Sequence, residues 1–409
     1  MRRLVSLAAL AAVTSVAAGC GDASSPQPRE VKLDFCASEA PSFFAIRNDG
    51  AAWTAMTADA SGTFTFLATQ KVAVAYVRQS GTSYTTTVLY ATTDELLPLS
   101  GVSCVETAGT RTISGSTSGL VAGDFAAAAM AAGRAVVFPP NSTFQLTQMP
   151  AGPADLLAFR SKLTEPPPLK LIIRRDVDVA SGGALAPLDF GSTEAVSPVT
   201  RTITIENLVA GESNRIDLFF RTRTTTPVFL HGVSGVTTAA QSISMVPDAV
   251  LRPDDWHSID VLARASAANY RGERQFFHAP SDRTATLAEA LPEPTVAVIA
   301  GTPRVRVTIA RQTAYPSFLS LRFDQRPPAT RRLVVLATAG YVGTSGAWDV
   351  EVPDVSSVTG FPQASSLQSG ADATWVVEAY QGSLGVHLGV LSEGARLRYA
   401  GRTGTLPIP

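Results

Sequence analysis

The sequence predicts an all-β protein built from tandem antiparallel β-sandwich modules. Apolar patterns with a helical period are nearly absent, while short alternating or β-branched runs recur between turn residues. Residues 72–77 and 305–309 are typical runs of this kind. The chain has 409 residues, of which 45% are hydrophobic, so it can bury substantial cores. At roughly 100–150 residues per domain, two to four domains are expected.

The charge content excludes two classes of protein. The formal net charge is −1, and only 16% of the residues are charged. A net charge near zero argues against binding that neutralises phosphates, so we expect no nucleic-acid partner. The low charged fraction also argues against a charged coiled coil or an acidic disordered chain.

The N-terminus has the pattern of an export signal. Arg2 and Arg3 precede an apolar run over residues 4–19, which ends at Cys20. A basic start, an apolar stretch and small residues at its end are typical of a secretory signal peptide, here residues 1–19. The run is shorter than the roughly 20 residues that span a bilayer as a helix. An ordinary signal peptide cut near Ala18 is the alternative to a lipid-linked one.

The segment Val16-Ala17-Ala18-Gly19-Cys20 resembles a bacterial lipobox. The resemblance implies that Cys20 is the lipidation site, carries fatty acyl chains such as palmitate and becomes the new N-terminus. We therefore expect a lipoprotein of the bacterial cell envelope that binds the membrane through its N-terminal lipid. Gly21 after the cysteine favours the outer membrane or cell surface. Residues 20–30 are small, polar and proline-containing, which predicts a flexible tether.

Cys36 and Cys104 are the two cysteines left after Cys20. An even pair in an exported protein predicts a disulfide bond. The bond would close a loop of about 68 residues and stabilise the fold by about 4 kcal/mol through chain entropy. A pair of metal-binding or reactive thiols is the weaker interpretation, because two thiols alone do not form a zinc site.

Composition divides the chain at proline-rich connectors. Three prolines at 166–168 favour extended backbone, and a second proline pair lies within residues 291–294. The Ala-rich segment 125–132 could be a short helix or a strand. The expected order is a signal peptide 1–19, a tether 20–30, a disulfide-closed sandwich 31–106, a sandwich with connector 107–199, and sandwiches 200–294 and 295–409.

Two motifs delimit the segment 112–160. It begins with TISGS at 112–116 and ends with FQLTQMPAGPADLLA at 144–158. In these motifs it resembles the carboxypeptidase regulatory-like group of transthyretin-type sandwiches. The resemblance implies a seven-stranded module, immunoglobulin-like or transthyretin-like in architecture. Modules of this group are accessory, so it implies no catalytic residues.

Motifs for catalysis are missing from the sequence. It contains no Gly-x-Ser-x-Gly, no phosphate-binding glycine loop and no His-Glu-x-x-His, and we expect no cofactor and no bound metal. The densest polar and aromatic patch is Asp254-Asp255-Trp256-His257. It could be a ligand-facing loop, although paired acids after Pro253 are more typical of a turn that leads into a strand.

These observations predict a non-catalytic binding, adhesion or scaffold role, with an envelope protein or a glycan as partner. The alternative is a cell-envelope hydrolase that acts on glycan or peptide and carries accessory sandwiches. Such an enzyme would need acids or histidines that converge in space. A β-propeller is a third possibility, against which the disulfide-closed first unit speaks.

Overall fold

The computed structural model confirms the all-β class, with 56% strand and 6% helix. Cys20, Cys36 and Cys104 lie outside the described residues, so lipidation and the disulfide bond stay predictions. No helix in the described part of the chain is both long and apolar enough to span a membrane. The structure describes residues 27–35, 40–99, 109, 111–164, 167–235, 239–299, 304–326, 329–344 and 346–409.

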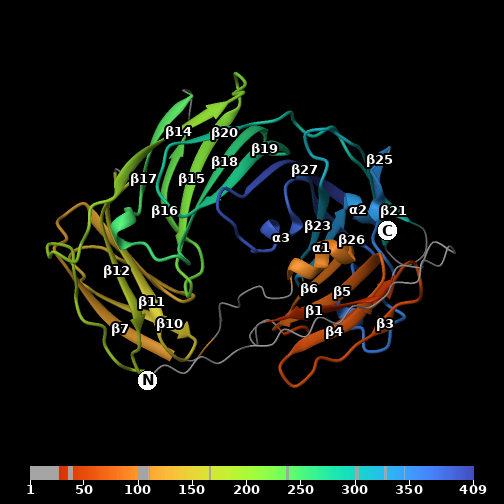
Figure 1. Cartoon of the computed structure of the whole chain (residues 1–409), viewed down its shortest axis with the longest axis horizontal. Helices are drawn as coiled ribbons and strands as arrows, with labels where there is room; N and C mark the ends of the chain where they lie inside the picture. Colours follow the sequence, from red (N-terminus) through yellow and green to blue (C-terminus); the bar gives the residue numbers. More distant parts are fainter. Residues whose placement is uncertain are drawn as a thin grey trace, which may run out of the picture.

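One long sheet of twelve strands organises the molecule (Figure 1). All neighbouring strands in it are antiparallel except β24 and β6, which are parallel. Its strands come from the segments 31–106, 200–294 and 295–409, which are therefore joined by main-chain hydrogen bonds. In sheet order they are β16 (Val228–Ser234), β15 (Ser213–Arg221), β18 (Trp256–Ser266), β19 (Asn269–Phe277), β27 (Arg396–Ile408), β26 (Ala371–Gln381), β23 (Phe318–Gln325), β24 (Arg331–Thr338), β6 (Ser83–Thr92), β5 (Lys71–Ser80), β2 (Phe43–Asn48) and β3 (Thr54–Ala55).

Three small sheets supply the partner layers of the long sheet. They are β1 (Arg29–Asp34) with β4 (Thr63–Ala68); β17 (Ala240–Met245), β14 (Val199–Glu206) and β20 (Arg283–Thr286); and β21 (Thr295–Ile299), β22 (Arg304–Ala310) and β25 (Ala347–Glu351). The helices are single turns: α1 (Thr93–Leu96), α2 (Ala339–Val342), α3 (Leu384–His387), and the 3₁₀ turns η2 (Leu97–Leu99), η3 (Asp248–Val250) and η4 (Gln363–Ser365).

Strand β5 shows why the long sheet has partners on both faces. Ala73, Ala75 and Val77 point into the core under β21, β22 and β25. Val72 and Val74 point to the opposite face, into the core under β1 and β4. Successive side chains alternate between the faces of a strand, so a run that is apolar at every position is buried on both.

The segment 111–190 folds into two facing sheets at the lower left of Figure 1. Its Ala-rich run is a strand rather than a helix, because it pairs on both sides with other strands. Ile113, Leu146, Leu156 and Ile172 fill the core between the two sheets. The sheets are β10 (Thr143–Met149), β7 (Arg111–Ser118) and β13 (Leu188–Asp189), and β12 (Pro168–Val177), β11 (Ala154–Lys162), β8 (Asp124–Met130) and β9 (Gly133–Val137).

A polar row separates two apolar cores on one face of the long sheet. The strand register places Glu273 of β19 between Val261 of β18 and Arg398 of β27. Val261 belongs to the core under β14, β17 and β20. Ala400, two residues after Arg398, belongs to the core under β21, β22 and β25. Glu273 therefore lies at the junction of the two halves of the sheet.

The Glu273 carboxylate is fully buried, with 0% exposure, and accepts several hydrogen bonds. Oε1 accepts from Gln275 Nε2 at 2.7 Å and from Arg396 Nη1 at 3.3 Å. Oε2 accepts from Arg398 Nε at 3.1 Å and from the Thr286 backbone N–H at 3.3 Å. A buried charge is tolerated when it is paired and hydrogen-bonded in this way.

We predict that Glu273→Gln lowers the free energy of unfolding by about 3 kcal/mol, because it leaves two arginines beside the junction without their counter-charge. Urea denaturation measures the change. Glu30→Gln is the matched control, since Glu30 pairs with Lys32 at 3.0 Å on an exposed strand. Exposed pairs contribute about 0–1 kcal/mol. Equal effects of the two substitutions would show that the junction is not stabilised by this charge.

Candidate functional site

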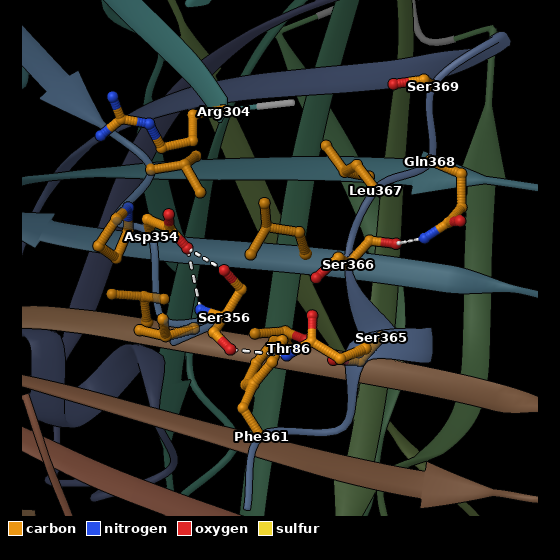
Figure 2. Close-up of a pocket in the computed structure, with 16 residues that line it drawn as sticks. Thr86, Arg304, Asp354, Ser356, Phe361, Ser365, Ser366, Leu367, Gln368 and Ser369 are labelled. Carbon is orange, nitrogen blue, oxygen red and sulfur yellow. Dashed lines mark hydrogen bonds between the residues drawn. The ribbon is translucent and has the colours of Figure 1, made fainter. Parts of the chain in front are cut away.

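A cavity of about 500 Å³ lies beside the parallel strands β6 and β24 (Figure 2). Small-molecule sites typically measure about 300–1,000 Å³. Thr86 and Val88 of β6 and Leu333 of β24 form its floor, and the segment 352–369 after β25 forms its walls. The cavity thus combines strands and a loop that are far apart in the sequence.

The wall segment is held in place by its own contacts. The Phe361 ring packs edge-to-face on Phe43 of β2, with ring centroids 5.3 Å apart. Asp354 Oδ1 accepts from the Ser356 N–H at 2.9 Å and from Ser356 Oγ at 2.6 Å. Gln363 Nε2 donates to the Ser356 carbonyl at 2.6 Å. These bonds order the loop before any ligand binds.

Thr86 is the most informative residue of the cavity. It is 4% exposed, and its Oγ1 has no hydrogen-bond partner in the part of the chain that the structure describes. A buried hydroxyl left unpaired costs about 1–3 kcal/mol. Thr86 shares a face of β6 with Val88 and lines the cavity, while its hydroxyl oxygen is itself buried.

The cavity offers hydroxyl and amide groups above an apolar floor. Ser356, Ser365, Ser366, Ser369, Gln363 and Gln368 contribute the polar rim. Arg304 also lines the cavity, but its Nη1 lies 2.6 Å from Glu351 Oε1, so its charge is compensated. Asp354 is the one carboxylate among the described lining residues, and none of these is histidine or lysine. This chemistry suits a neutral ligand with both hydroxyl groups and an apolar surface.

The patch at 254–257 lies elsewhere, at the turn into β18. Asp255 is buried, and its carboxylate accepts from Arg175 Nη1 at 2.9 Å and from the Arg252 N–H at 2.8 Å. The Trp256 ring lies on the His278 ring, with centroids 3.7 Å apart. Asp254 is exposed. None of the four residues lines the cavity of Figure 2, and their observed contacts are within the protein.

His257 is fully buried and neutral in its environment. Its Nε2 accepts from the Val246 N–H at 3.2 Å, so Nδ1 carries the proton and donates to the His278 carbonyl at 2.7 Å. Burial lowers the pKa of His257 to about 4, and burial also lowers the pKa of His387 to about 4. Both side chains act as structural groups at neutral pH.

A second polar cavity, of about 230 Å³, lies on the opposite face of the long sheet. Tyr270 and Tyr380 donate to the two oxygens of Glu378 at 2.6 and 2.8 Å. Tyr399 donates to Asp260 Oδ1 at 2.7 Å. Burial raises the pKa of all three tyrosines. Sequence reasoning missed this cluster because its residues come from four strands, β18, β19, β26 and β27, and only the register brings them together.

Comparison with known proteins finds no family model that matches the chain and no curated protein that matches it. Within the described residues, no group of three or more His, Cys, Asp and Glu side chains is arranged to hold a metal ion. Fold and cavity together define an all-β protein whose long mixed sheet carries a ligand-sized pocket.

We predict that Thr86→Val leaves stability unchanged or raises it by about 1 kcal/mol, because it removes a hydroxyl that has no partner. Thr338→Val is the control: Thr338 is equally buried, and its Oγ1 donates to Glu95 Oε2 at 2.7 Å. That substitution should destabilise by about 1–3 kcal/mol. A comparable loss for both variants in urea denaturation would contradict the assignment of Thr86.

Stability should fall below pH 6.5. The unfolded histidines bind a proton near pH 6.5, whereas folded His257 and His387 stay neutral down to about pH 4. The unfolding free energy therefore decreases by up to about 1.4 kcal/mol per pH unit for each histidine between these values. Above pH 7.5 both states are neutral and this contribution is constant. Denaturation of wild type and His387→Leu from pH 7.5 to 5 should show a smaller slope for the variant; equal slopes would contradict the prediction.

Proposed function

We propose that this protein is a non-catalytic binding protein of the bacterial cell envelope, and that the cavity of Figure 2 recognises the sugar units of an envelope glycan. The observation that carries the proposal is a ligand-sized cavity in which serine and glutamine side chains surround an apolar floor. The envelope location rests on the lipobox-like segment that ends at Cys20.

The chemistry of the cavity supports a sugar as ligand. A sugar ring has apolar C–H faces and hydroxyl groups that both donate and accept. Val88, Leu333 and Leu367 offer an apolar contact surface, and the serine and glutamine rim offers groups that also donate and accept. Because Arg304 is already paired with Glu351, its charge does not favour a negatively charged ligand.

The small number of acidic side chains at the cavity supports binding without hydrolysis. Most glycosidases place two carboxyl groups on either side of the scissile bond. Of the described lining residues only Asp354 is acidic, and it accepts two hydrogen bonds from Ser356. The serine hydroxyls of the rim have no histidine or lysine beside them among the lining residues described, so no activated nucleophile is supplied there.

A cell-envelope hydrolase is the second proposal, and the tyrosine cavity is the observation that favours it. Glu378 lines that cavity, and Asp260 is bonded to its Tyr399 wall. Both carboxylates are already occupied by tyrosine or arginine donors, which fits a structural role as well. Release of reducing sugar or peptide from a bound ligand would favour the hydrolase.

We predict that the secreted chain carrying Cys20→Ser binds neutral oligosaccharides saturably on a glycan array and in calorimetry. Ser366→Ala, which removes a hydroxyl from the rim, should weaken binding about tenfold, the value of one lost hydrogen bond. Leu367→Trp should abolish it by filling the cavity. Thr87→Val is the matched control, because Thr87 points to the other face of β6. Failure of every neutral saccharide to bind, or unchanged binding by Leu367→Trp, would overturn the proposal.

A further inference from the structure

An apolar groove of about 320 Å³ separates the four-stranded sheet from the end of the long sheet. Phe125 of β8 and Phe159 of β11 form one wall, and Val228 and Leu230 of β16 form the other. The groove lies outside the cavity of Figure 2 and shares no residue with it. A ligand of the groove can therefore be proposed and tested independently of the proposed glycan site.

The Ala-rich run of β8 creates the groove. The register pairs Ala127 with Phe159 and Ala129 with Leu157, and all four side chains line the groove. Methyl groups at the two alanine positions leave space that larger side chains would fill. Native cores are close-packed and contain few voids larger than a water molecule, so this space needs an explanation.

Exposed apolar side chains gather at the groove. Val136 is 54% exposed and Phe229 is 40% exposed, and both line it. Phe138, which is 46% exposed, contacts Phe125 with ring centroids 6.1 Å apart. Contiguous exposed apolar surface of this kind marks a binding site more often than a free surface.

Arg134 is the one cationic side chain among the described residues that line the groove. Its Nη1 donates to the carbonyls of Ala131 and Gly133 at 3.2 and 2.9 Å. Its Nη2 donates to the Thr226 carbonyl at 3.0 Å and to the Thr226 hydroxyl. No carboxylate of the described residues lies within ion-pair distance of this guanidinium, so its charge is not compensated by an acid. These acceptors fix the guanidinium and use its four terminal N–H groups, so the Nε–H is the donor left for an anion.

We propose that this groove binds a long-chain fatty acid, with the acyl chain between β8, β11 and β16 and the carboxylate on Arg134. The apolar walls match the chain, and the uncompensated cation matches the head group. A second copy of this protein pairing through the same patch is the competing occupant, and the experiment distinguishes the two.

The test titrates cis-parinaric acid, a fluorescent fatty acid, into the delipidated secreted chain carrying Cys20→Ser, so that no acyl chain of its own competes. The expected result is saturable one-to-one binding, displaced by hexadecanoate and not by hexanoate. Ala129→Phe fills the groove and should reduce affinity at least tenfold. Arg134→Gln should weaken hexadecanoate about tenfold but leave displacement by hexadecanol unchanged.

Leu67→Gln is the control, because Leu67 is an exposed apolar residue of β4 outside the groove. It should bind as wild type does, whereas Phe229→Gln should bind more weakly. Circular dichroism confirms that each variant is folded, and Arg134→Gln tests the site without changing the groove volume. Non-saturable binding, or equal binding by Ala129→Phe and wild type, would overturn the proposal. So would dimers that Phe229→Gln disrupts in sedimentation experiments.

Discussion

The buried charge of Glu273 is the constraint on which the continuity of the long sheet depends. It stands where the core under β14, β17 and β20 gives way to the core under β21, β22 and β25. Main-chain pairing continues through this point from β18 to β19 to β27. An apolar junction would merge the two cores, whereas a paired carboxylate admits only side chains that donate to it. Polar networks of this kind can specify one arrangement of the elements around them.

The same division explains where the cavities lie. Each small sheet covers only part of the long sheet, so the remaining surface is enclosed by loops or by the neighbouring sheet. Where the cover of β25 ends, the segment 352–369 encloses the cavity of Figure 2. Where β16 meets the sheet of β8 and β11, small side chains leave the apolar groove. Both sites follow from covering one long sheet with several short ones.

Strands were predictable from the sequence because their signal is local. The continuous apolar run at 72–77 and the alternating run at 305–309 lie in β5 and β22. The Ala-rich run at 125–132 did not distinguish a helix from a strand, because alanine is compatible with both. Its pairing with β9 and β11 makes it a strand. The shared sheet and the cavity were not predictable, since Thr86 meets Leu333 only through a parallel pairing between distant segments. The patch at 254–257 is the opposite case. Its polar and aromatic residues are adjacent in the sequence, yet they form a turn whose side chains contact other residues of the protein.

Aromatic rings pack closely over two glycines of β27. Tyr270 lies flat over Gly401, and a Cβ at that glycine would come within 2.4 Å of the tyrosine ring. Trp375 covers Gly404 in the same way, with the ring directly opposite the glycine in the register. Aromatic side chains that cover glycines fill a sheet surface closely. An unpaired hydroxyl at Thr86 and an unfilled space beside Ala129 are, by contrast, local costs of the fold. A ligand that fills the space beside Ala129 would offset the second of these costs.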